Sequence, residues 1–193
     1  DRLQGLRSLV FMDYEQEESE ISWLISADLA PLLHALPKLE YFKTRGGEGL
    51  EFRELKHEAL RTLIIETGGL SAQTIMQISE ATLPELEHLE LWLGSSDYGF
   101  DATLDTLKPL IVGLPYPEQS YPFPKLRSLA LCNSELQDAI AEAFVGAPVL
   151  KQLDVPPGGS LTLMGPSGSG KSSVLAAIAG TLHTVAEGSE ALR

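Results

Sequence analysis

Residues 165–172, "GPSGSGKS", carry the most specific chemistry in this sequence. They match the spacing G-x-x-x-x-G-K-[ST], in which glycines allow successive backbone N–H groups to turn toward a phosphate. Lys171 is expected to reach the β- and γ-phosphates of a nucleotide, and the Ser172 hydroxyl is expected to hold Mg²⁺. The pattern therefore predicts a phosphate-binding loop with these contacting residues: Gly165, Pro166, Ser167, Gly168, Ser169, Gly170, Lys171, Ser172 and Ser173.

The residues around this loop predict the elements that would hold it in place. An apolar strand is expected over 160–164, and a helix over 170–180 would direct its positive end at the same phosphate. The wider stretch "PPGGSLTLMGPSGSGKSSVLAAIAGTL" resembles the start of an ATP-binding-cassette nucleotide-binding domain, over about residues 146–188. That resemblance implies ATP and Mg²⁺ as ligands.

Several parts of such a nucleotide-binding domain are missing after the loop. The family requires a carboxylate motif, a signature loop and a switch histidine, and "HTVAEGSEALR" contains none of them. Asp13 in "LVFMDYE" superficially fits the carboxylate motif, but it precedes the loop and follows a predicted strand. Hydrolysis of ATP by this chain alone is therefore not expected. The alternative hypothesis is a fragment of a cassette ATPase or transporter nucleotide-binding subunit that is inactive alone.

The rest of the chain contains a recurring L-x-x-L-x-L pattern. It begins at residues 6, 39, 60, 86, 126 and 150, and three of the five intervals fall within the roughly 20–29 residues of a leucine-rich repeat. Each segment predicts a short strand that buries its three apolar side chains and pairs in parallel with the next. Return helices are expected over 27–36, 71–81, 102–114 and 135–147.

Residues 1–155 resemble an uncharacterised bacterial leucine-rich-repeat family, through "EISWLISADLAPLL", "ETGGL" and "LPELEHLELWLGSSDYG". The resemblance implies a curved solenoid that binds proteins in the cytosol. The predicted fold is α/β: a leucine-rich-repeat solenoid with a parallel sheet over 1–155, ending in a truncated strand–P-loop–helix segment over 156–193. Only "PPGG" separates Val155 from Ser160, too few residues for a parallel crossover, so the strand over 160–164 is expected to run antiparallel to the last repeat strand or to leave the solenoid. Because "VLKQLDV" suits both families, a chimera in which a cassette segment interrupts the solenoid near its C-terminal end is one hypothesis.

Residues between the leucine anchors are expected to point out of the concave sheet face. They mix charged and aromatic side chains, as protein-binding surfaces do. The same pattern also fits a solvated sheet face with no partner. The candidate partner-binding residues are Tyr41, Arg45, Glu66, Glu90 and Trp92, together with Tyr98 in an insertion.

Composition narrows the remaining function classes. The 193 residues carry a formal net charge of −13, which disfavours binding to nucleic acid or to an anionic membrane. No apolar run is long enough to span a membrane. The single cysteine, Cys132, fits a reducing compartment, so a cytoplasmic location is expected. The four histidines lie far apart without metal-ligand spacing, and no Ser–His–Asp arrangement is predicted.

Overall fold

The computed structural model describes residues 3–12, 25–113 and 121–144. Within these residues the chain forms a five-stranded sheet in the order β1-β2-β3-β4-β5, and every pair of neighbouring strands is parallel. The strands are β1 (Ser8–Phe11), β2 (Tyr41–Arg45), β3 (Thr62–Glu66), β4 (His88–Gly94) and β5 (Ser128–Ser134). The α/β class and the parallel sheet predicted from the sequence are thereby confirmed.

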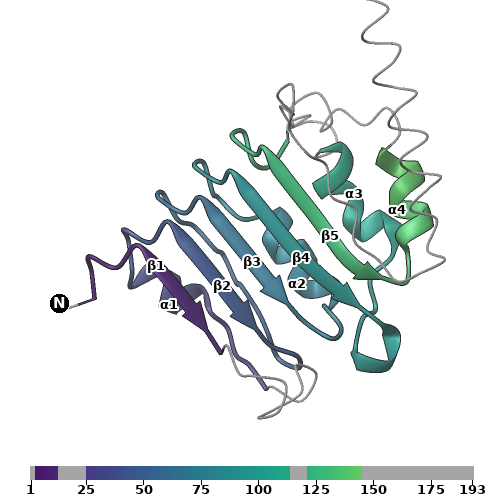
Figure 1. Ribbon diagram of the computed structural model, residues 1–193, viewed down its shortest axis with the longest axis horizontal. Coiled ribbons are helices and arrows are strands. Elements are labelled where there is room, and N and C mark those ends of the chain that lie inside the picture. Colours follow the sequence, from purple (N-terminus) through teal and green to yellow (C-terminus); the bar gives the residue numbers. More distant parts are fainter. Residues whose placement is uncertain (1–2, 13–24, 114–120, 145–193) are drawn as a thin grey trace, which may run out of the picture.

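The helices all lie on one face of this sheet, and the opposite face carries no described helix (Figure 1). The four are α1 (Ala30–His34), α2 (Ala72–Ser79), α3 (Leu104–Val112) and α4 (Gln137–Phe144), and a short 3₁₀ helix, η2 (Ser96–Tyr98), follows β4. Each of the four α-helices falls within one of the predicted ranges. The core therefore lies on the helix-covered face of the sheet. The opposite face, which carries no described helix, is the open face.

The strands are held in register by equivalent positions of the L-x-x-L-x-L segments. The central leucine position forms one continuous ladder across the sheet, since neighbouring strands pair Leu9, Phe42, Leu63, Leu89 and Leu129 in turn. Side chains alternate between the two faces of a strand, so these residues all point to the helix side. Phe42, Leu63 and Leu89 are completely buried there.

Local polar contacts explain where α2 begins and how it is attached. Ser71 caps the helix by accepting a hydrogen bond from the Thr74 N–H at 3.2 Å. The Thr74 hydroxyl donates to the Leu50 carbonyl at 2.7 Å, and the Gln77 side chain accepts from the Phe52 N–H at 2.7 Å. These bonds tie α2 to the segment between β2 and β3, which contains no helix.

Two glycine-containing turns pack directly against each other after β3 and β4. The Leu70 N–H donates to the Leu93 carbonyl at 2.7 Å, and the Ser95 N–H donates to the Gly68 carbonyl at 2.9 Å. Gly69 and Gly94 face one another in this bridge. A side chain at either position would overlap the backbone of the opposite turn, so only glycine permits the approach. This contact positions the loops at the carboxyl edge of the sheet.

Candidate functional site

The predicted phosphate-binding residues Gly165–Ser173 lie outside the described residues, as do Asp13 and the sixth L-x-x-L-x-L segment. The predicted Mg²⁺ ligand Ser172 and the predicted helix over 170–180 also lie outside the described residues. The phosphate-binding (Walker A) loop therefore stays a prediction from the sequence. Within the described ranges, no group of three His, Cys, Asp or Glu side chains is placed to hold a metal ion.

The structure separates the predicted partner-binding residues into four places. Tyr41 lies near the amino end of β2, and Arg45 and Glu66 meet where β2 and β3 end. Glu90 and Trp92 lie on β4, on the open face. Tyr98 lies in η2, beyond the carboxyl end of β4, with its side chain exposed.

Glu66 was predicted to contact a partner, but the structure places its carboxylate beneath two cationic side chains. Its residue exposure is only 5%, because Lys43 and Arg45 of the neighbouring strand lie over its carboxylate. The Lys43 Nζ is 2.7 Å from Oε1 and the Arg45 Nε donates to Oε2 at 2.6 Å. Burial acts to raise the pKa of Glu66, but the hydrogen bonds from these two cations outweigh it and the net pKa is lowered. Glu66 therefore orients Lys43 and Arg45 on the open face.

Trp92 and Glu90 form the second group on the open face. The indole Nε1–H of Trp92 donates to Glu90 Oε1 at 2.8 Å, and His88 Nε2 is 3.5 Å from Glu90 Oε2. Trp92 also pairs in register with Cys132 of β5. Burial raises the pKa of the Cys132 thiol to about 11, and the nearby carboxylates of Glu90 and Glu66 add to the shift. Glu90 thus fixes the orientation of the indole.

A serine, a histidine and a carboxylate also come together here, which the sequence analysis missed. The His88 Nδ1 lies 2.8 Å from the Ser128 Oγ, and the other ring nitrogen faces Glu90. The residues are 40 positions apart in sequence, so only the strand register reveals the contact. The Ser128 backbone N–H already donates to the Glu87 carbonyl at 3.0 Å, so it offers no free donor for an oxyanion. We assign this group to cross-strand pairing rather than to nucleophilic catalysis.

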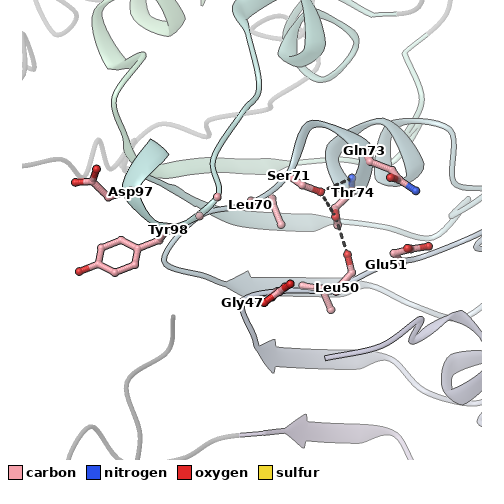
Figure 2. A pocket seen from close by; sticks show the side chains of 13 residues that line it. Gly47, Leu50, Glu51, Leu70, Ser71, Gln73, Thr74, Asp97 and Tyr98 are labelled. Carbon is pink, nitrogen blue, oxygen red and sulfur yellow. Dashed lines mark hydrogen bonds between the residues drawn. The ribbon is translucent and has the colours of Figure 1, made fainter. Parts of the chain in front are cut away.

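A cleft of about 560 Å³ opens at the carboxyl edge of the sheet. Its walls are the loops after β2, β3 and β4 and the first turn of α2 (Figure 2). Figure 2 shows Ser71 and Thr74 hydrogen-bonded at its centre, with Asp97 and Tyr98 to one side and Gln73 and Glu51 to the other. Sequence analysis singled out Tyr98 but did not predict this cleft.

Electrostatics differ between the cleft and the open face. Charged lining residues of the cleft are the carboxylates Glu48, Glu51 and Asp97. Glu51 accepts hydrogen bonds from Arg53, which lower its pKa. The open face instead holds the cationic pair Lys43 and Arg45 around one carboxylate. The open face also carries the carboxylate of Glu90, so it mixes both signs of charge, whereas the charged residues that line the cleft are all acidic.

Comparisons with known proteins bear on different parts of the chain. The family model described as ABC transporter matches residues 151–191, the segment that contains the predicted phosphate-binding loop. This match supports an ATP-binding-cassette nucleotide-binding segment. None of the curated proteins matches the chain.

A solved structure resembles the described sheet. It is a crystal structure of a Bacteroides fragilis protein determined by the Northeast Structural Genomics Consortium, with 32% sequence identity and a TM-score of 0.70. The similarity covers 78% of this chain and 41% of the Bacteroides fragilis chain, so this chain spans less than half of that protein's length.

No described helix is both long and apolar enough to cross a membrane.

Proposed function

We propose that residues 1–155 form a leucine-rich-repeat solenoid that serves as a protein-interaction scaffold. The supporting feature is the ladder of equivalent leucine positions through five parallel strands, with helices on one face only. In such repeats the sheet face without helices is the binding surface. We also propose a cytoplasmic location, which suits the single buried thiol, Cys132.

The observation that carries this proposal is the pre-oriented aromatic and cationic set on the open face. Tryptophan and arginine dominate binding energy at many protein interfaces. The Trp92 indole is held by Glu90, and the Arg45 guanidinium is held by Glu66. Side chains that are already fixed lose less conformational entropy when a partner binds, so they suit a recognition surface.

A crosslinking experiment with two positions tests the scaffold. A photo-reactive residue replaces Tyr41 on the open face or, as the control, Met76, which is 47% exposed on α2. We expect a defined partner to be captured from the Tyr41 position only. The affinity of that partner should fall about 30-fold in Trp92→Ala and stay unchanged in Met76→Ala. Equal capture from both positions, or unchanged affinity in Trp92→Ala, would count against the open face.

We propose a second function, binding of Mg·ATP phosphates by Gly165–Ser173, which the family match over residues 151–191 favours. In this proposal Lys171 contacts the β- and γ-phosphates and Ser172 contributes to the Mg²⁺ shell. Bound Mg²⁺ would neutralise phosphate charge, while the backbone N–H groups of the loop orient the nucleotide. Residues 156–193 then form a nucleotide-binding segment of the ATP-binding-cassette type.

Titration calorimetry tests the nucleotide proposal directly. We expect micromolar binding of Mg·ATP by the unmodified chain and no measurable binding by Lys171→Ala, with no release of phosphate by either. A matched control is Lys108→Ala, since Lys108 lies on α3 and pairs with Asp105. Absence of binding by the unmodified chain would overturn this function and leave the scaffold proposal standing.

A further inference from the structure

The strand β1 lies at one edge of the described sheet, and its outer side differs from the boundaries between described strands. At each internal boundary, one carbonyl accepts two consecutive N–H groups of the next strand. Arg7 accepts from Glu40 and Tyr41 at 2.8 and 2.9 Å, and Glu40 accepts from Arg61 and Thr62 at the same distances. The pattern continues with Arg61 and Glu87 as acceptors for the two following strands. It is therefore a structural rule of this sheet.

In β1, Arg7 and Ser8 are the residues whose N–H groups would donate in this pattern. No residue within 3–12, 25–113 and 121–144 supplies the carbonyl that their N–H groups would require. Unpaired strand edges are avoided in isolated sheets, usually by proline, lysine or an inward-pointing charge. The β1 sequence, "SLVF", contains none of these.

Apolar side chains of β1 and of the turn before it are less buried than those of the inner strands. Leu3 and Val10 are 65% and 44% exposed. Leu6 and Leu9 are only partly buried, whereas the equivalent positions in β2 and β3 are completely buried. Figure 1 shows β1 as an outermost strand of the described sheet, with β2 on one side only. Leu6 and Leu9 therefore keep part of the apolar surface that the inner strands bury.

Charge also indicates what would pair there. The position just before each strand alternates in sign through Arg7, Glu40, Arg61, Glu87 and Arg127. Arg7 pairs with Glu40, and Arg61 pairs with Glu87 at 3.5 Å. An acidic residue opposite Arg7 continues this alternation, whereas a basic one would place like charges side by side.

We propose that the β1 edge docks one further repeat of the same kind, joined ahead of β1, whose strand pairs in parallel with β1. That strand carries an acidic residue opposite Arg7 and apolar residues opposite Leu9 and Phe11. The similar Bacteroides fragilis chain is longer, since the matched region makes up 41% of its length. This inference rests on the proposed repeat fold and is independent of partner and nucleotide binding.

A fusion protein tests the proposal. A copy of residues 60–85 that carries Arg61→Glu, which places an acidic residue opposite Arg7, is joined directly ahead of Leu6, since Leu86, which follows Glu85, is the position equivalent to Leu6. We expect amide exchange at Arg7 and Ser8 to slow at least about tenfold, and the urea midpoint to rise. The control fusion carries Leu63→Asp and Ile65→Lys in the copy only, and should show neither effect.

Three outcomes overturn the proposal. The first is equal exchange at Arg7 and Ser8 in both fusions. The second is slow exchange in the unmodified chain as a monomer, which would mean that the edge is already covered. The third is slow exchange that depends on protein concentration, which would assign the edge to a second copy. If the fusion does not fold, a peptide of residues 60–70 with Arg61→Glu, added in excess, must slow exchange relative to the same peptide with Leu63→Asp, and failure to do so also overturns the proposal.

Discussion

The contact between the turns after β3 and β4 gives the sharpest quantitative prediction. Three glycines there separate two physical effects. Gly69 has an ordinary φ but lies against the Tyr98 carbonyl, Gly99 has φ +98° with nothing nearer than 3.9 Å, and Gly94 combines φ +75° with the close approach to Gly68. Alanine at each position therefore tests crowding alone, backbone conformation alone, and both together.

The magnitudes follow from the interactions that each substitution removes. A left-handed conformation costs alanine about 1–2 kcal/mol, part of which the stiffer unfolded chain offsets. Gly99→Ala should therefore cost about 1 kcal/mol. Relieving the overlap at Gly94 requires the two turns to separate, which breaks the Leu70–Leu93 and Ser95–Gly68 hydrogen bonds at about 0.5–1.5 kcal/mol each. Gly94→Ala should then cost about 2–5 kcal/mol, a large part of a typical domain's stability.

Urea unfolding followed by circular dichroism at 222 nm measures all three variants on the same scale. We expect the loss of unfolding free energy to be smallest for Gly99→Ala and largest for Gly94→Ala, with Gly69→Ala between them. If Gly94→Ala were no less stable than Gly99→Ala, the turns would not be in backbone contact, and the cleft that they form would have to be redrawn.

Three further predictions concern the sheet. Glu66 has a lowered pKa in the folded state, so its ion pairs stabilise the fold at pH values above the unfolded pKa of about 4.3. This stabilisation is lost as the pH falls through the folded pKa. Urea midpoints at pH 7 and pH 3 should therefore differ less in Glu66→Gln than in the unmodified chain. With its pKa near 11, Cys132 should have about 100-fold less thiolate than a thiol of pKa 9.0, so iodoacetamide at pH 8 should react fast only after unfolding, and equal rates would refute the burial. Phe42→Ala should cost about 3–5 kcal/mol and Val10→Ala under about 0.5 kcal/mol in urea unfolding, because Phe42 is completely buried and Val10 is 44% exposed.

The elements of this fold could be predicted from local patterns. The spacing of apolar residues located β1–β5, because each strand buries alternate side chains and the leucine positions repeat. Helix ranges were predicted a few residues too long. The 71–81 range shortens to Ala72–Ser79, where the Ser71 cap and the Glu80 C-cap set the ends.

The side-chain environment of the candidate site could not be predicted in the same way. Glu66 follows two isoleucines and reads as an exposed strand end, yet its burial depends on Lys43 and Arg45, more than 20 positions earlier. The His88–Ser128 contact spans 40 residues. Both depend on the register between strands, which single-sequence periodicity does not specify. The Walker A residues show the opposite case, since a contiguous motif is readable without any tertiary contact.

Residues of the open face and of the cleft differ in how much their substitution disturbs the fold. Glu66 and Glu90 hold cations and an indole through hydrogen bonds, so substituting either changes both the open face and the stability of the sheet. Tyr98 is 54% exposed in η2, on a loop after β4, where a substitution leaves the strand ladder intact. Recognition at the cleft can therefore be probed by Tyr98→Ala without disturbing the fold. Recognition at the open face can be probed by comparing Trp92→Ala with Trp92→Phe, which keeps an aromatic ring but loses the donor to Glu90 and part of the indole surface.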